Sequence, residues 1–381
     1  MADSPVPQTD PKASYLDSRA EIDAAMRKVL EGGWYILGEE VAAFEREFAA
    51  FIGAPHGVGT ASGTDALVLG LKALDVGPGD GVVTVSHTAV ATVAAIEITG
   101  ATPILVDVDP VTFTMDVEDL RAVLERPPAG VKAIKAIVPV HLYGHPAPIE
   151  AICALAARHG AAVLEDVSQA HGASVGGRRL GRFGALGAFS LYPTKNLGAF
   201  GDGGVIVTED EGVAERLKAL REYGWRRRYI SDSAGFNSRL DELQAAILRV
   251  KLARLEADNQ RRRAIAAAYD TGLAGLPLTL PREPPGAVHV YHQYVVRVVG
   301  RDAVKAALAA RGVGSNIHYP LPVHLQPAYL GRTAMGPSGL RATEALGAEI
   351  LSLPMYPQMD AAMIARVIGA LHQVLGEALG G

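Results

Sequence analysis

Hydrophobic residues recur in a regular pattern between about residues 60 and 210. Short runs rich in valine and isoleucine alternate there with alanine-rich stretches of helical spacing. Buried strands that alternate with helices are typical of a parallel sheet with crossover connections. The runs that we predict as strands are Gly81–Ser86, Thr102–Asp107, Ala133–Val140, Ala161–Glu165 and Gly204–Thr208.

A different pattern follows this region. In Arg239–Glu256, apolar residues recur at intervals of three and four, which predicts a long amphipathic helix that links two domains. Beyond it the pattern predicts a strand over His289–Val298, a helix over Arg301–Arg311 and a terminal helix over Met359–Ala378. We therefore predict an α/β protein with an N-terminal extension (1–14), a large domain with a mostly parallel sheet (15–250) and a smaller C-terminal α+β domain (251–381).

Composition narrows the class of protein. The chain has 381 residues, 49% of them hydrophobic, which is enough for two domains that each bury a hydrophobic core. A net charge of −5 without a long basic run argues against nucleic acid as the main partner. No apolar run approaches membrane-spanning length, and the N-terminus lacks a signal pattern. The single cysteine, Cys153, lies on an apolar helix face, so we expect a protein of the reducing cytoplasm.

Lys195 is the first candidate for chemistry. It lies among small and turn-forming residues just after an apolar segment, in Ser190–Gly204. An aldehyde cofactor needs such an accessible amine, with glycines that let its ring approach the backbone and a hydroxyl near its phosphate. By itself, a lysine in a loop is more often simply solvated.

Asp166 is the second candidate. It ends a predicted strand, at the edge of an α/β sheet where ligands generally bind. A carboxylate there can face a pyridine nitrogen and favour its protonated form, with Gln169 on the ring hydroxyl and His171 along the ring. This stretch alone equally allows Asp166 to cap the following turn.

Thr60–Leu67 places small polar residues directly before a helical apolar run. Free N–H groups at a helix N-terminus form an anion site that suits a phosphate. The pattern alone is also explained by ordinary capping through Ser62 or Thr64.

Taken together, these motifs resemble one family, the DegT/DnrJ/StrS sugar aminotransferases within the fold-type I, aspartate-aminotransferase-like enzymes. The resemblance covers roughly Tyr15 to Gln373. Each motif is weak alone, but their order and spacing are specific. The motifs are Gly33–Gly38, Ala61–Thr64, Ser86–Thr88, Val140–His145, Glu165–Gly172, Tyr192–Asn196, Gly201–Gly204, Asn237–Glu242 and Ile317–Pro320.

The resemblance implies a pyridoxal 5'-phosphate enzyme that passes through the pyridoxamine form and needs no metal. It implies that Lys195 forms a Schiff base with the cofactor and moves protons between cofactor and substrate, while Asp166 pairs with the ring nitrogen. The other implied cofactor contacts are Gln169 on the ring oxygen, Gly63, Thr64 and Ser190 on the phosphate, and Asn237 from the partner subunit of a homodimer. One departure is Ala89, where family members commonly carry an aromatic residue that stacks on the ring.

The motifs are most similar to members that aminate the C3 ketone of nucleotide-linked 6-deoxysugars. We therefore expect a dTDP-3-keto-6-deoxyhexose as acceptor and L-glutamate as amino donor. We expect Arg226 and Arg228 to contact the diphosphate, because arginine has forked donors, although a solvated surface run explains them almost as well. The other expected substrate contacts are Tyr35, His318 and Tyr319.

Three alternatives stay open at this point. The acceptor could be a C4-keto sugar or a carbocyclic ketone such as a keto-inositol, because the motifs do not define the ring. Relatives that dehydrate carry histidine at the lysine position, and Lys195 argues against that chemistry. A cofactor-binding regulator without turnover is disfavoured, because a sensor does not need the set formed by Asp166, Gln169 and Lys195.

Overall fold

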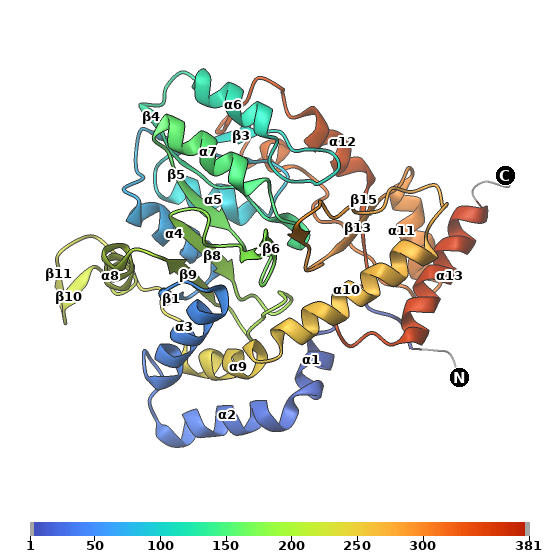
Figure 1. Cartoon of the computed structure of the whole chain (residues 1–381), viewed down its shortest axis with the longest axis horizontal. Coiled ribbons are helices and arrows are strands. Elements are labelled where there is room, and N and C mark those ends of the chain that lie inside the picture. Colours follow the sequence, from blue (N-terminus) through green and yellow to red (C-terminus); the bar gives the residue numbers. More distant parts are fainter. Residues whose placement is uncertain (1–3, 378–381) are drawn as a thin grey trace.

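The computed structural model describes residues 4–377, so the first three residues of the predicted extension and the predicted helix end at Ala378 lie outside the described residues. A mixed eight-stranded sheet with helices on both faces forms its centre (Figure 1). In spatial order its strands are β1 (His56–Thr60), β9 (Gly204–Thr208), β8 (Leu186–Ser190), β5 (Ala162–Asp166), β4 (Ala133–Ile137), β2 (Asp80–Val85), β3 (Thr102–Val106) and β14 (Ala334–Met335).

The sheet is mostly parallel, as the sequence predicts. Five neighbouring pairs, from β8 to β14, are parallel. Strand β9, which the sequence predicts as a strand of this sheet, runs antiparallel to β8 and to β1. No helix lies between β8 and β9, and an antiparallel neighbour needs only a loop, whereas a parallel one needs a crossover.

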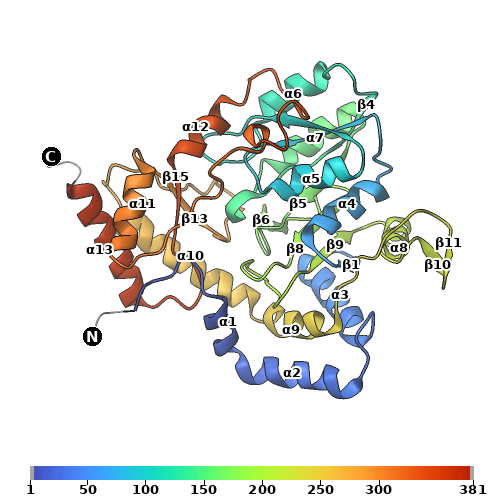
Figure 2. The same cartoon turned by 180° about the vertical axis from the view of Figure 1, so that it is seen from behind.

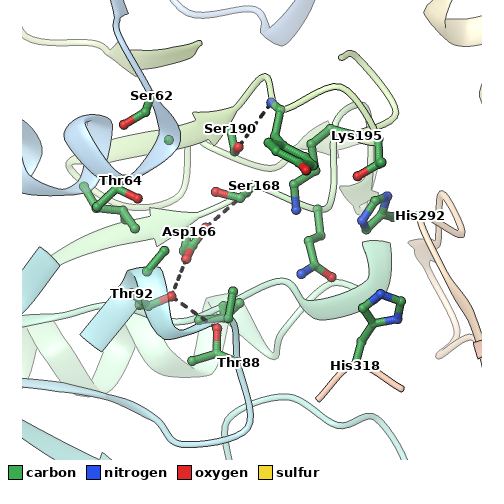
Figure 3. Close-up of a pocket in the computed structure, with 18 of the residues that line it drawn as sticks. Ser62, Thr64, Thr88, Thr92, Asp166, Ser168, Ser190, Lys195, His292 and His318 are labelled. Carbon is green, nitrogen blue, oxygen red and sulfur yellow. Dashed lines mark hydrogen bonds between the residues drawn. The ribbon is translucent and has the colours of Figure 1, made fainter. Parts of the chain in front are cut away.

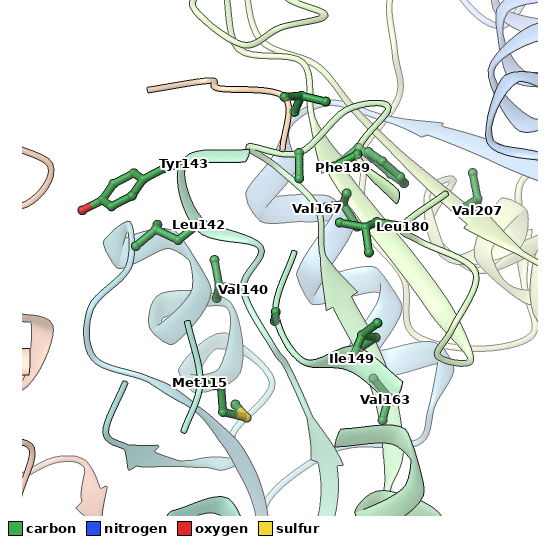
Figure 4. Close-up of a cluster of buried hydrophobic side chains, with 14 of the residues drawn as sticks. Met115, Val140, Leu142, Tyr143, Ile149, Val163, Val167, Leu180, Phe189 and Val207 are labelled. Atoms are coloured by element: carbon green, nitrogen blue, oxygen red, sulfur yellow. The ribbon is translucent and has the colours of Figure 1, made fainter. Parts of the chain in front are cut away.

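Side chains on the two faces of the sheet enter two separate hydrophobic clusters. On β9, Val205 and Val207 join one cluster and Ile206 joins the other, because successive residues of a strand point to opposite faces. Figure 4 shows part of the first cluster, around Phe189 and Val163. Helices that contribute side chains to the first cluster are α3 (Glu39–Ile52), α6 (Val117–Glu125), α7 (Ile149–His159) and α9 (Glu242–Leu252). Helices that contribute to the second cluster are α4 (Gly63–Ala73), α5 (Val90–Ile98) and α8 (Glu211–Leu220).

The C-terminal elements gather at one end of the molecule around a further hydrophobic cluster (Figure 2). Val6, from the N-terminal segment, is buried in the same cluster. The predicted long helix is interrupted: α9 ends at Leu252 and α10 begins at Leu255. The elements of this end are α10 (Leu255–Gly272), β13 (Tyr294–Arg297), α11 (Arg301–Ala310), β15 (Ile350–Leu353) and α13 (Ala361–Glu377), with β13 and β15 paired antiparallel.

The chain beyond residue 251 also contributes to the large sheet, because β14 pairs with β3. The predicted domain boundaries stay a prediction. Within residues 4–377, no helix is long and apolar enough to cross a membrane. The remaining elements are α1 (Pro11–Asp17), α2 (Arg19–Gly32), α12 (Arg341–Glu349), the 3-10 turns Leu142–Gly144 and Val323–Leu325, the hairpin β10 (Trp225–Arg227) and β11 (Ile230–Ser231), and the small strands β6 (Ser174–Val175), β7 (Arg178–Arg179) and β12 (Ala287–Val288).

Candidate active site

A pocket of about 340 Å³ opens at the edge of the sheet where the parallel strands β5 and β8 end. Asp166 is the last residue of β5 and Ser190 is the last residue of β8, and both line the pocket. In Figure 3, Ser62 and Thr64 lie on one side of this pocket, with His292 and His318 on the opposite side. Loops after neighbouring parallel strands meet at one sheet edge, which is where an α/β protein places a ligand.

Asp166 is held in place by two hydrogen bonds. Its Oδ2 accepts from the Thr92 hydroxyl at 2.8 Å, and its Oδ1 accepts from the Ser168 backbone N–H at 3.1 Å. The capping role and the position in the pocket, which were alternatives in the sequence, therefore occur together. The neighbouring Glu165 points to the opposite face of β5, where its carboxylate accepts from the Gly181, Phe183 and Gly184 amides at 2.7–2.9 Å. Asp166 is thus a rigid negative charge at the pocket wall.

Lys195 follows β8 in a turn that is closed by its backbone N–H and the Tyr192 carbonyl, at 2.9 Å. Its side chain lines the pocket, and its ammonium makes no hydrogen bond or ion pair with any residue in the range 4–377. Burial lowers the pKa of Lys195 from 10.5 to about 8, although the negative charge of Asp166 acts in the opposite direction. The amine is therefore available as a nucleophile and as a proton carrier near neutral pH.

The N-terminus of α4 forms the opposite wall. Ser62 is the N-cap residue, and its hydroxyl accepts from the Asp65 amide at 3.1 Å, so the predicted capping is correct. The amides of Gly63 and Thr64, in the first turn, face the pocket without an intrahelical acceptor. A Cβ on Gly63 would lie 2.4 Å from the Ser190 Cβ, so only glycine lets this helix end approach β8 so closely. Free amides beside a serine hydroxyl make a site for a phosphate group.

Comparison with known proteins identifies the family. A model of the DegT/DnrJ/EryC1/StrS aminotransferase family matches residues 16–372. The chain belongs to this family. Its fold is that of solved aminotransferases of the same kind: the crystal structure of S. venezuelae DesV in complex with a ketimine intermediate superposes with a TM-score of 0.92 at 46% identity, and the match covers 97% of this chain and 98% of that chain.

Two named members of the family are similar to the chain over nearly their whole length. The chain is 47% identical to dTDP-3-amino-3,4,6-trideoxy-alpha-D-glucose transaminase of Streptomyces venezuelae, over 97% of this chain and 96% of the relative. It is 43% identical to UDP-N-acetyl-3-dehydro-alpha-D-glucosamine 3-aminotranferase of Acidithiobacillus ferrooxidans, over 97% of this chain and 98% of the relative.

The residues of this aminotransferase fit pyridoxal 5'-phosphate. An amine without a partner, a fixed carboxylate and an uncapped pair of helix amides surround one space, and they correspond to the aldehyde, the ring nitrogen and the phosphate of that cofactor. Gln169 also lines the pocket. Its Oε1 accepts from the Tyr143 amide at 2.8 Å and its Nε2 donates to the Tyr319 hydroxyl at 3.1 Å, which leaves one N–H for a ring oxygen.

His318 and Tyr319, the predicted substrate contacts, line the pocket from the C-terminal part of the chain, and their contact with a substrate stays a prediction. Burial, and then the positive charge of Lys195, lowers the pKa of His318 to about 4. Its Nδ1 lies 2.8 Å from the Ser352 hydroxyl. Burial raises the pKa of Tyr319 to about 12. Both side chains are therefore neutral hydrogen-bonding groups at neutral pH, which suits recognition of a sugar better than recognition of a charge.

Four predicted residues do not line this pocket. Asn237 is exposed and lines an adjacent pocket, and Asp202 lines both. Tyr35 is exposed and its hydroxyl donates to the Leu30 carbonyl at 3.4 Å. Arg226 and Arg228 belong to the exposed β10–β11 hairpin, which projects from the body beside α8 (Figure 1). A single chain does not bring these four residues to Lys195, so their roles remain predictions.

The pocket also contains residues to which the sequence analysis gave no role. They line the pocket from helix α5 and from several loops: Thr88, Thr92, Tyr192, Asp202, His292 and Gln293. A signal for the last two was present, because the adjacent polar residues His292 and Gln293 interrupt the segment that we predicted as one strand. In the structure β13 begins only at Tyr294, and the pair precedes it as pocket wall.

The stacking position at Ala89 stays without an aromatic ring from its own segment. Ala89 lines the pocket, but His87 does not: its Nε2 lies 2.9 Å from the Tyr143 hydroxyl, deep in the core. His171, which we expected along the ring, is also not part of the pocket lining and packs against Phe189 with ring centroids 5.5 Å apart. Both histidines therefore pack against other side chains outside the pocket lining.

Proposed function

We propose that this protein transfers an amino group from L-glutamate to the C3 ketone of a nucleotide-linked 6-deoxysugar, with a dTDP-3-keto-6-deoxyhexose as the preferred acceptor. The observation that carries the proposal is the Lys195 amine, which faces the pocket without a partner between Asp166 and the N-terminus of α4. The two relatives described above are named for nitrogen at the 3-position of dTDP- or UDP-linked sugars, which supports C3. We place the protein in the cytoplasm.

The pocket residues have distinct tasks in this reaction. Pyridoxal 5'-phosphate, when bound, supplies the electron sink and carries the amino group. Lys195 would move a proton between a substrate carbon and a cofactor carbon, first as base and then as acid. Its lowered pKa suits both directions of this transfer. Asp166 keeps a negative charge where the ring nitrogen would lie, and the Thr92 hydroxyl holds that carboxylate in position. The α4 amides and the Ser190 hydroxyl would hold the phosphate.

We propose further that the working unit is a homodimer with shared active sites. Trp34, Tyr35 and Ile36 are 66%, 48% and 41% exposed and form a run of large apolar side chains at the surface. Ile36 lines the same adjacent pocket as Asn237. Apolar surface next to a site is typical of an interface, and a second copy seated there would cover it and bring Asn237 to the partner's pocket.

The substrate assignment is tested in the reverse direction. Cofactor-loaded protein is mixed in turn with a dTDP-3-amino- and a dTDP-4-amino-6-deoxysugar, and the visible absorption band of the cofactor is followed. We expect loss of the band with the 3-amino sugar alone. Loss with the 4-amino sugar alone would assign the enzyme to C4-keto sugars. A response to L-glutamate but to neither sugar would favour another acceptor, such as a carbocyclic ketone, and no response at all would favour a regulator.

The catalytic role of the lysine is tested with Lys195→Ala. The variant is expected to bind the cofactor without covalent attachment and to lose turnover by several orders of magnitude, about as much as is lost with other covalent catalysts. Retained turnover at the parent rate would overturn the assignment. Lys218→Ala is the matched control, because that lysine lies on the surface of α8.

The shared site is tested by complementation. Lys195→Ala and Asn237→Ala subunits, each poorly active alone, are unfolded together and refolded as mixed dimers. If Asn237 serves the partner's pocket, each mixed dimer contains one intact site and activity returns. If Asn237 serves its own chain, or if the chain works as a monomer, the mixture stays as inactive as its components.

The arginine contacts are tested separately. Arg226→Ala with Arg228→Ala is expected to raise the KM for the sugar nucleotide about tenfold or more, because charged hydrogen bonds to a diphosphate would be lost. Arg227→Ala is the control, because Arg227 directly follows Arg226 in β10 and successive residues of a strand point to opposite faces, whereas Arg228 lies in the turn after the strand. An unchanged KM in the double variant would leave the arginines as solvated surface residues.

A further inference from the structure

The inner face of α10 carries two buried polar residues. Asn259 and Arg262 are 3% and 5% exposed and lie one helical turn apart, between the apolar residues Leu255 and Ile265. A buried amide or guanidinium group costs free energy unless it makes hydrogen bonds, so buried polar side chains usually hold specific parts of the structure together. Both residues lie outside the pocket lining.

The Asn259 amide connects the two segments that carry the proposed catalytic residues. Its Oδ1 accepts from Asn196 Nδ2 at 2.8 Å, and Asn196 directly follows Lys195. Its Nδ2 donates to the His171 carbonyl at 2.8 Å, on the segment that begins with Asp166. One side chain therefore spans from the loop after β8 to the loop after β5.

The requirement for an amide at this position is strict. The side chain must accept on one side and donate on the other, which an aspartate or an alanine cannot do. The packing is also tight: a Cβ on Gly172, whose φ is +88°, would lie 2.8 Å from Asn259 Nδ2. The loop after β5 thus passes so close to α10 that a side chain at residue 172 would displace the amide.

Neighbouring contacts strengthen the same connection. Asn196 Nδ2 also donates to the Val290 carbonyl at 3.0 Å. Lys251, at the end of α9, donates to the Gly198 carbonyl in the loop that follows Lys195. Arg262 Nη1 donates to the Tyr291 carbonyl at 3.2 Å and to the Met355 carbonyl at 3.1 Å, and so holds the segment that leads into the pocket residue His292.

We propose that Asn259 is a positioning residue, which fixes the Lys195 loop relative to the Asp166 loop through Asn196 and the His171 carbonyl. Its catalytic consequence rests on the proposed transamination, because a proton carrier must reach both reacting carbons with little freedom. Its structural consequence, the position of the Lys195 loop, does not depend on the proposed function. If the bridge is lost, the Lys195 loop moves outward and its amine becomes hydrated, so the pKa of Lys195 rises from about 8 towards its ordinary value of 10.5.

The experiment uses Asn259→Ala, Asn196→Ala and, as a control on the exposed face of the same helix, Gln260→Ala. In cofactor-free protein, Lys195 is arylated with trinitrobenzenesulfonate at a series of pH values, and its modification is measured by peptide mass mapping. We expect a midpoint near pH 8 in the parent and in Gln260→Ala, and a midpoint about one pH unit higher in the two bridge variants.

The loaded enzymes provide the second measurement. We expect kcat to fall about tenfold or more in both bridge variants with KM nearly unchanged, because the reacting groups and not the sugar contacts are displaced. The two effects should be less than additive in the double variant, since both substitutions break the hydrogen bond between Asn196 and Asn259. If Asn259→Ala does not fold, Asn196→Ala gives the same two measurements, because Asn196 is only half-buried.

Two results separate the possible failures. An unchanged midpoint and an unchanged kcat, with only a lower unfolding temperature, would show that Asn259 stabilises the fold without positioning Lys195. Absence of transamination in the parent protein would refute the proposed function, and the arylation midpoints would still decide whether the bridge holds the lysine.

Discussion

Replacing Lys195 with methionine is expected to make the cofactor-free protein more stable while it abolishes activity. The pocket holds the amine in a poorly hydrated place without a counter-ion in contact, and burial lowers its pKa from 10.5 to about 8. Each pKa unit corresponds to about 1.4 kcal/mol of preference between the two protonation states. The lowering of this pKa by about 2.5 therefore corresponds to about 3.5 kcal/mol. This value is an upper limit on the free-energy cost of the buried charge, because the side chain is only half-buried.

The effect should depend on pH in a defined direction. Below about pH 8, Lys195 is protonated in the folded and in the unfolded chain, and the folded state carries the full cost. Between about pH 8 and 10.5 the folded amine is neutral while the unfolded one still binds a proton, so the parent protein gains stability as the pH rises. Lys195→Met lacks this titration. Its advantage should be largest at pH 7 and should shrink towards pH 10.

The assay is urea unfolding of cofactor-free protein, followed by helical circular dichroism at one fixed protein concentration, because a ligand or an association equilibrium would change the apparent stability. Lys12→Met, on the exposed side of α1, is the control and should change the unfolding free energy by less than about 0.5 kcal/mol. Equal stability of Lys195→Met and the parent at pH 7, or an advantage that grows with pH, would refute the reasoning.

Three other predictions follow from the pocket. Gly63→Ala should weaken cofactor binding at least about tenfold in an absorbance titration, because its Cβ would lie 2.4 Å from the Ser190 Cβ and the two segments must separate. Glu165→Leu should lower the free energy of unfolding by about 3 kcal/mol or more in urea, since three amides lose their acceptor. In single-turnover amination by pyridoxamine-loaded protein, the rate should rise with pH through about pH 8, because neutral Lys195 is the base.

Each of these predictions has an outcome that contradicts it. Parent-like cofactor affinity in Gly63→Ala would mean that the α4 terminus can move away from β8 without consequence. A Glu165→Leu protein of parent stability would mean that water replaces the lost acceptor. A rate that does not change between pH 6 and pH 9 would mean that another group is the base or that its pKa lies outside this range.

The sequence located the centre of the site because the relevant signals are local. Asp166 ends a strand and Lys195 follows one, and in a parallel sheet such positions come to the same edge whatever the rest of the chain does. Ser62 and Gly63 precede a helical run, so a free helix N-terminus could be predicted without the structure. The family motifs then indicated which cofactor group each of these residues would contact.

Other parts were not accessible to local reasoning. The direction of β9 depends on the loop that precedes it, not on its own valines and isoleucine. The pair His292-Gln293 reads as strand interior in sequence but forms pocket wall, because β13 begins only at Tyr294, where pairing with Leu353 starts. A periodic pattern predicts which residues are buried, but not which element covers them.

The sequence by itself thus determined the parallel strands β2, β3, β4 and β5, the family and the local placement of Asp166, Lys195 and the α4 N-terminus. Only the tertiary structure decided that Asn259, 63 residues beyond Asn196, joins the two loops that carry Asp166 and Lys195. The physical reason is the range of the interactions. Backbone geometry and hydrophobic periodicity act over a few residues, so they can be recognised in a short stretch of sequence. The contact between two buried polar side chains from distant segments depends instead on how whole helices and sheets pack.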